Sequence, residues 1–336
     1  MDKISVIVPC FNEQEAIPVY YDAIKPIMDS MKEVIFELIF VDDGSSDGTL
    51  TAVRELAKQD RRCSYLSFSR NFGKEAALYA GLSNATGDYV AVMDVDLQDP
   101  VELLPKMYQM IQDEDCDCVA TRRSDREGEP KIRSFLSDCF YKFINKISNT
   151  EIVNGARDYR MMKKSMVKAV LEMHEYNRFS KGIFQWVGFR TVWLEFHNTE
   201  RCAGETKWSL AKLAAYSLEG ILGFSVVPLS LASVMGILFC IVAFFMTVFI
   251  AARTMIFGDP VAGWTSLACI IFLVSGVQLF CIGIIGAYLS KTYLEAKHRP
   301  IYILKEEALN QHKKDMHKNM DTQNKKEEGQ NIKYSK

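Results

Sequence analysis

The chain of 336 residues has little net charge and few cysteines. Its 40 Lys and Arg residues nearly balance 42 Asp and Glu residues, which leaves a formal net charge of −2. That balance excludes a globally basic nucleic-acid-binding protein, so we expect no nucleic-acid partner. Nine cysteines are too few for a disulfide scaffold, and the close pair Cys116 and Cys118 has no second pair or histidine at zinc spacing. The cysteines therefore indicate free thiols in a reducing compartment.

The amino-terminal segment lacks the pattern of a secretory signal, because residues 1–13 run directly into a β-rich sequence. Charge is absent from two long runs further on, residues 226–252 and 264–290. A helix of either length exceeds the roughly 30 Å core of a bilayer, and two such helices are difficult to bury in a chain of this size. We therefore predict a membrane domain over 226–290 that consists of two transmembrane helices.

Basic residues flank the two outer ends of this hairpin, so we expect a multi-pass protein of the cell membrane with both termini in the cytoplasm. The catalytic part would then also be cytoplasmic. Residues 291–336 are polar and low in apolar content, which predicts a disordered cytosolic tail.

Apolar β-rich runs alternate with helical patterns in the first part of the chain. The runs are residues 4–9, 35–41, 65–69, 89–93 and 118–121, and the helical patterns are 14–31, 47–59 and 73–85. This alternation predicts an α/β fold with a mostly parallel sheet, Rossmann-like, with helices on both faces, in a cytosolic domain over 1–225. Ligands of such sheets bind beyond the carboxyl ends of the strands.

The second run ends in the sequence VDDGSSDGT. Gly44 permits a tight turn after Asp42, and the following Ser and Asp residues suit a helix cap. One interpretation is simply an acidic strand end before a capped helix. The other is a carboxylate that accepts the imide N–H of uracil or guanine. The glycines are too few for a GxGxxG or Walker loop.

The fourth run ends in DVDLQDP, where Asp94 and Asp96 lie two residues apart. On an extended segment their carboxylates would project to the same side as Gln98. Hard oxygen ligands of this kind suit Mg²⁺ or Mn²⁺, with water and a diphosphate completing the shell. The alternative is a pair of solvated acids in a turn before Pro100.

Five motifs precede the two apolar runs in a fixed order: PCFNE, VDDGSSDGT, DVDLQDP, NGARDYRMM and RCAGETKWS. In this order the chain resembles the family-2 glycosyltransferases with a GT-A fold. The resemblance covers about residues 1–300 and extends to the polyprenyl-phosphate branch, with its bactoprenol glucosyltransferases and dolichyl-phosphate mannose synthases. It implies an inverting enzyme that moves one hexose from a UDP-sugar, UDP-glucose first, to polyprenyl (undecaprenyl) phosphate for cell-envelope glycosylation. UDP-N-acetylglucosamine, UDP-galactose and other nucleotide sugars stay open, as does a homo-oligomer.

The resemblance also implies a role for each matching residue. Uridine would be held by Pro9, Phe11, Glu13 and Asp42, the metal by Asp94, Asp96 and Gln98, and the diphosphate by Arg201 and Lys207. Asp158 falls where related enzymes have a catalytic carboxylate, and Asp96 would join it in catalysis. The alternative for Arg201 and Lys207 is a pair of juxtamembrane positive charges. The alternative for Asp158 is a buried acid paired with Arg157 or Arg160.

For the acceptor phosphate we expect Arg122, Arg133 and Ser137. Arg133 and Ser137 share one face at the start of an amphipathic helix predicted over 134–149, and a helix amino end favours anions. Arg122, or Arg123 in its place, lies at the other end of a charged loop. A second amphipathic stretch covers 210–224, and both stretches are core faces or lie in the membrane interface. A lipid phosphate is already anionic, so Asp158 is needed less as a base than as a positioning group.

Two other functions compete with this interpretation. A processive polysaccharide synthase of the same superfamily would need a QxxRW motif and more apolar spans than this chain has. A membrane scaffold without activity would have no need for the acidic and basic residues of the motifs. The sequence therefore favours the transferase.

Overall fold

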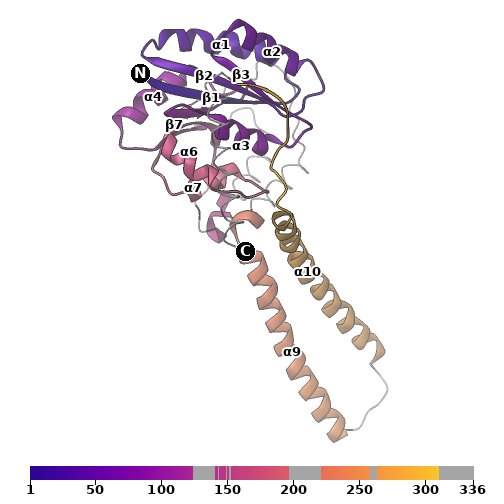
Figure 1. Ribbon diagram of the computed structural model, residues 1–336. Coiled ribbons are helices and arrows are strands. Elements are labelled where there is room, and N and C mark those ends of the chain that lie inside the picture. The colour runs from indigo at the N-terminus through magenta and orange to yellow at the C-terminus, as the bar shows by residue number, and fades with distance from the viewer. Residues whose placement is uncertain are drawn as a thin grey trace, which may run out of the picture.

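The computed structural model describes residues 1–123, 141–142, 144–148, 150, 153–196, 221–257 and 263–309. Over that part the chain forms an eight-stranded mixed sheet with helices on both faces, and two long helices project from one end of it (Figure 1). The order of the strands is β7-β5-β6-β4-β1-β2-β3-β8.

The first half of the sheet consists of four parallel strands and the helices between them. These are β1 (Asp2–Cys10), α1 (Ala16–Ser30), β2 (Val34–Asp42), α2 (Thr49–Gln59), β3 (Cys63–Phe68), α3 (Lys74–Asn84) and β4 (Tyr89–Val92). Each was expected from the alternation of the sequence, and only the end residues differ. This half confirms the mostly parallel α/β architecture.

The second half mixes strand directions. It contains α4 (Leu103–Asp113), β5 (Cys118–Arg123), β6 (Ala156–Lys163), α6 (Lys164–Leu171), α7 (Ser180–Trp186) and β7 (Thr191–Phe196). Strand β6 lies between β4 and β5 and is antiparallel to both, whereas β5 and β7 are parallel. The antiparallel strand brings the NGARDYRMM motif against the end of β4.

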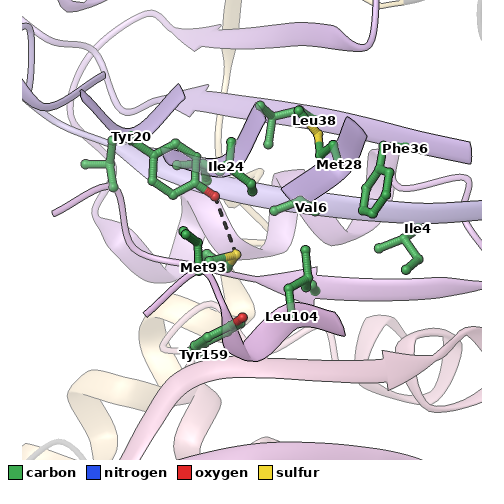
Figure 2. Packing of buried hydrophobic residues seen from close by; sticks show 14 of the residues in the cluster. Ile4, Val6, Tyr20, Ile24, Met28, Phe36, Leu38, Met93, Leu104 and Tyr159 are labelled. Atoms are coloured by element: carbon green, nitrogen blue, oxygen red, sulfur yellow. Dashed lines mark hydrogen bonds between the residues drawn. The ribbon is translucent and has the colours of Figure 1, made fainter. Parts of the chain in front are cut away.

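Two apolar clusters fix the helices to the sheet. Helices α1, α2 and α4 cover one face, where Tyr20 and Leu104 are fully buried against strand residues such as Val6 (Figure 2). The Tyr20 hydroxyl lies 3.5 Å from the sulfur of Met93. Helices α3, α6 and α7 cover the other face. Burial on both faces explains why the parallel strands are continuously apolar.

Strand β8 (Leu304–Ala308) comes after the long helices and pairs antiparallel with β3 at the edge of the sheet. Arg54 on α2 donates to both carboxylate oxygens of Glu306, and the ring of Tyr302 stacks on Phe68 with centroids 5.0 Å apart. Part of the polar segment expected to be a tail is therefore a strand of the sheet, and residues 310–336 lie outside the described part.

Helices α9 (Val227–Phe257) and α10 (Trp264–Ala296) extend side by side away from the sheet (Figure 1). Their apolar side chains are largely exposed, with Phe244 at 66% and Leu279 at 69%. The stretches 227–246 and 273–296 are long and apolar enough to cross a membrane. Two contacts tie α10 to the loop before α7: Tyr176 N–H donates to Glu295 at 2.8 Å, and Lys291 donates to Asn177 at 3.0 Å.

Candidate active site

A cavity of about 260 Å³ opens at the carboxyl ends of β1, β2 and β4. Its wall includes five of the residues expected from the sequence, namely Pro9, Phe11, Glu13, Asp94 and Asp96. Asp43 and Lys74, which the sequence motifs did not assign, also line it. Three motifs that are separate in the sequence therefore meet at the carboxyl edge of the parallel strands, where such sheets bind their ligands.

Hydrogen bonds join the loop after β1 to the loop after β2. The backbone N–H of Asn12 donates to Ser45 Oγ at 2.9 Å, and the side-chain oxygen of Asn12 accepts from Ser46 N–H at 2.9 Å. Glu13 N–H donates to Thr49 Oγ1 at 2.8 Å. Asn12 has a positive φ of 54°, a conformation that Asn tolerates better than most residues. The two loops thus form one wall of the cavity.

The carboxylate of Asp42 is 1% exposed and holds the loop that follows it. One oxygen accepts from Ser45 N–H at 3.0 Å, and the other accepts from the Ser67 hydroxyl at 2.8 Å. Gly44 has φ 67°, and a Cβ there would lie 2.3 Å from the carbonyl carbon of Arg70. Only glycine suits this turn.

The neighbouring Asp43 reaches the cavity wall. Its carboxylate accepts from the backbone N–H groups of Phe72, at 2.6 Å, and Gly73, at 2.9 Å. Burial raises the pKa of Asp43 to about 6, although these two hydrogen bonds oppose the shift. Asp43 therefore fixes the start of α3 against the end of β2.

Asp94, Asp96 and Gln98 follow β4 in a turn, not on the extended segment expected. The strand ends at Val92, and Leu97 has a positive φ of 54°. Gln98 N–H donates to Asp96 Oδ1 at 3.2 Å, which closes the turn. Both acids still face the cavity, because the turn and not an alternating strand directs them there.

Lys74 connects two of the expected site residues. Its ammonium lies 2.7 Å from Asp94 Oδ1, 2.9 Å from Asp94 Oδ2 and 2.6 Å from Asp158 Oδ2. Burial alone would raise the pKa of Asp158, but Lys74, helped by Lys181, holds it below its ordinary value. Asp158 is therefore ionised at neutral pH, and its ion-pair partner is Lys74 rather than Arg157 or Arg160.

Arg157 supports the turn after β4 from strand β6. Its Nε lies 2.8 Å from Asp99 Oδ1, and its Nη2 lies 3.3 Å from Gln98 Oε1. Asp99 is 1% exposed, and its burial raises the pKa of the carboxyl above the ordinary value despite the guanidinium. Arg160 instead lies over the ring of Phe184 and donates to the carbonyl of Arg157 at 2.9 Å.

The expected metal ligands have the right chemistry for a divalent cation. In the part of the chain that the structure describes, no group of three or more His, Cys, Asp and Glu side chains surrounds a single point. Asp94 and Asp96 nevertheless share one cavity, and the ammonium of Lys74 already lies against Asp94. Carboxylate oxygens that attract one cation suit a hard metal ion, with the amide of Gln98 beside them.

The structure describes Arg122 and its alternative Arg123, the last two residues of β5, on the acceptor side. Arg122, at the end of β5, pairs with Glu195 on the adjacent β7, where its Nε lies 3.0 Å from Glu195 Oε1. Arg133, Ser137, Arg201 and Lys207 lie outside the described residues. Of the amphipathic stretches 134–149 and 210–224, the structure describes residues 141–142, 144–148 and 221–224. Ile144 is fully buried against Phe179 and Phe224, so this described part of the two stretches is a core face.

Sequence reasoning missed Lys74, Asp43, Asp99 and Arg157. Lys74 had a readable signal, since it follows the third strand just as the expected acids follow the second and fourth. Asp99 and Arg157 had none, because their contact joins segments 58 residues apart across β6, a strand that the pattern did not predict.

Comparison with known proteins agrees with this arrangement. Residues 5–171 match the model of the family "Glycosyl transferase family 2". A prophage bactoprenol glucosyl transferase homolog of Escherichia coli K12 is 42% identical over 90% of this chain and 98% of its own length. The bactoprenol glucosyl transferase of Shigella phage SfV is 41% identical over 91% of this chain and 99% of its own.

Among solved structures, the chain is similar to glucosyl-3-phosphoglycerate synthase from Mycobacterium tuberculosis in complex with Mn²⁺, UDP-glucose and phosphoglyceric acid. The TM-score is 0.44 and the identity 20%, over 66% of this chain and 78% of that one. Three observations agree: the mostly parallel sheet, the acidic turns at its carboxyl edge, and the match to the bactoprenol enzymes over nearly their full length. The chain belongs to glycosyl transferase family 2 and is a glycosyltransferase with a GT-A-type fold.

Proposed function

We propose that the enzyme moves one hexose, glucose first, from a UDP-sugar to a polyprenyl phosphate at the cytoplasmic face of a membrane. The observation that carries the proposal is the joining of an acidic cavity, lined by Asp94 and Asp96, to two exposed apolar helices in one chain. Such a cavity suits a metal-bound nucleotide sugar, and such helices suit a lipid environment. The names of the two bactoprenol relatives support the transfer of glucose and a polyprenyl acceptor.

Uridine would lie against Pro9, Phe11 and Glu13, with its imide N–H donated to Asp42. The Asp42 carboxylate already accepts from Ser45 and Ser67, and an ionised carboxylate has lone pairs for a further donor. A preference for uracil over adenine and cytosine follows, because neither of those bases offers an imide N–H.

The diphosphate would lie over Asp94, Asp96 and Gln98, which would hold Mg²⁺ or Mn²⁺. When bound, the metal would neutralise charge on the departing UDP. Arg201 and Lys207 would add two cations to the same leaving group. Arg157, through Gln98 and Asp99, keeps the ligand turn in place before the donor arrives.

The acceptor is its own nucleophile, because a phosphate monoester is anionic near neutral pH. Its oxygen would form a bond to the anomeric carbon while the bond from that carbon to the diphosphate oxygen breaks, with inversion. Arg122, Arg133 and Ser137 would hold the phosphate, and Asp158 would orient it. The depressed pKa of Asp158 suits a fixed charge better than a general base.

Both α9 and α10 would cross the membrane, with the sheet and both termini on the cytoplasmic side. The distribution of basic residues, including Lys291 and Lys297 at the end of α10, favours that topology. A polyprenyl chain would then lie in the bilayer while its phosphate reaches the cavity.

Full-length protein purified in detergent, incubated with polyprenyl phosphate and radiolabelled UDP-sugars, tests the proposal. We expect one hexose per lipid, with UDP-glucose preferred over UDP-N-acetylglucosamine and UDP-galactose. Long polymer products would instead identify a processive synthase. Failure to label lipid with any UDP-sugar in the presence of Mg²⁺ or Mn²⁺ would contradict the proposed reaction.

A further inference from the structure

Lys74 is the cation nearest to the carboxylates of the site, and no sequence motif assigned it. It is the first residue of α3. Its ammonium contacts both oxygens of Asp94, at 2.7 and 2.9 Å, and one oxygen of Asp158, at 2.6 Å. One side chain therefore neutralises an expected metal ligand and the expected catalytic acid together.

This position is incompatible with undisturbed metal binding. A divalent ion that takes an oxygen of Asp94 as ligand would come within a few ångströms of the ammonium, and like charges at that distance repel strongly. The ammonium lies 2.7 and 2.9 Å from the two Asp94 oxygens, so a metal bound to either oxygen would lie beside that charge. Metal binding to Asp94 therefore requires the ammonium to move away from this carboxylate.

The ammonium is the group that is able to move. The Lys74 side chain is 42% exposed, whereas those of Asp94 and Asp158 are 25% and 17% exposed. Lysine carries its charge on a flexible four-carbon stem. The two acids have shorter side chains, on the segment directly after β4 and on strand β6.

We propose that Lys74 is a resident counter-cation of the donor site, which a divalent metal must displace from Asp94. In the metal-free enzyme it stops the two acids from repelling each other and so keeps the site assembled. Once displaced, it remains beside Asp158. The inference rests on the proposed function in one respect, the assignment of Asp94 as a metal ligand.

Binding of Mn²⁺ alone to the full-length, nucleotide-free protein tests this, with the free-ion signal followed by electron paramagnetic resonance. Lys74→Met should bind Mn²⁺ about tenfold more tightly than wild type, because the competing charge is gone. Lys74→Arg keeps the charge and should stay near wild type. Lys168→Met, an exposed lysine on α6 away from the cavity, is the matched control and should not differ from wild type.

Equal Mn²⁺ affinity in wild type and Lys74→Met would overturn the inference, and so would tighter binding in Lys74→Arg. Asp94→Asn separates the two levels of the argument. If Asp94→Asn weakens Mn²⁺ binding but Lys74→Met does not strengthen it, only the role of Lys74 fails. If Asp94→Asn leaves Mn²⁺ binding unchanged, the metal assignment fails and takes the inference with it.

A second experiment measures the melting temperature of Lys74→Met with and without Mn²⁺. Removing the ammonium leaves two close carboxylates unpaired, so chelated Lys74→Met should melt below wild type. Added Mn²⁺ should then raise the Tm of Lys74→Met, or of the uncharged but polar Lys74→Gln, by more than it raises that of wild type. An equal rise in all three would contradict the proposal.

Discussion

The two halves of the sheet differ in strand direction and in the part of the site that each supplies. The parallel half, β1 to β4, provides the cavity wall from Pro9 to Asp96. The mixed half, β5 to β7, provides Asp158 and Arg157 on β6 and Arg122 on β5. The parallel half is thus the donor half in our proposal, and the mixed half, continuing toward the apolar helices, is the acceptor half.

The halves meet where β6 pairs with β4, and Val92 lies opposite Arg160 there. Lys74 spans the junction by contacting Asp94 on one side and Asp158 on the other. In our proposal the parallel half therefore forms the nucleotide site, and transfer also needs the antiparallel strand β6. Variants in the two halves should therefore separate donor binding from transfer.

The largest effect is expected at the metal ligands of the parallel half. Asp96→Asn keeps the shape of the side chain but removes a ligand charge, so turnover should fall by about two to three orders of magnitude. Thermal unfolding should be unchanged. Chelation of wild-type enzyme should give the same loss. Near-normal transfer by Asp96→Asn, or by chelated wild type, would show that the metal assignment is wrong.

Asp158→Asn should lower turnover by about a hundredfold, because the acceptor would lose an orienting charge. UDP affinity should stay close to that of wild type, since Asp158 belongs to the acceptor half. Asp115→Asn, at a fully exposed acid, provides the control. If calorimetry shows that Asp158→Asn weakens UDP binding as much as it lowers turnover, the assignment of Asp158 to the acceptor half is wrong.

Asp42→Asn tests the donor half directly. The amide would present a donor to the uracil N–H, so UDP binding should weaken by about 1–3 kcal/mol, the cost of an unpaired buried group. Asn keeps one acceptor oxygen for Ser45 or Ser67, and a thermal melt checks that the loop survives. Calorimetry that gives an unchanged UDP affinity, or a wild-type preference for GDP, would refute the assignment.

Arg133→Ala should have the smallest effect, about a threefold to tenfold rise in KM for polyprenyl phosphate or an equal loss of turnover. UDP binding should stay within error of wild type. Arg190→Ala, at an exposed arginine paired with Asp115, is a matched control. If UDP affinity falls together with transfer, Arg133 belongs to the donor half instead.

The same comparison explains what could be predicted from the sequence. Strands β1 to β4 were readable because each is a short apolar run separated from the next by a helical stripe. Strand β6 was not, since it carries the charged residues Arg157, Asp158 and Arg160, and Arg160 is fully buried only because the strand pairs with distant segments. Strand β8, with the sequence LKEEA, looks like a polar tail because an edge strand exposes most of its side chains.

The acidic residues of the candidate site could be predicted from the sequence, but the ion pairs that join them to other strands and helices could not. Motif order and resemblance predicted Asp94, Asp96 and Asp158 as site residues, and the structure places the first two at one cavity and the third against Lys74. The Lys74 contact with Asp158 joins residues 84 positions apart, across a strand pair that no local pattern encodes. Sequence patterns report the ends of strands, whereas the charges that meet between strands depend on the register of the sheet.

The central claim is that the two halves form one metal-dependent site for transfer of a hexose to a lipid phosphate. Its most direct test is the initial rate of glucose transfer from UDP-glucose to polyprenyl phosphate by full-length enzyme, measured with Mg²⁺ or Mn²⁺ and again after chelation. We predict one glucose per lipid with metal present and a near-complete loss of transfer without it. Undiminished transfer after chelation, or hydrolysis of UDP-glucose with no sugar on the lipid, would contradict the account.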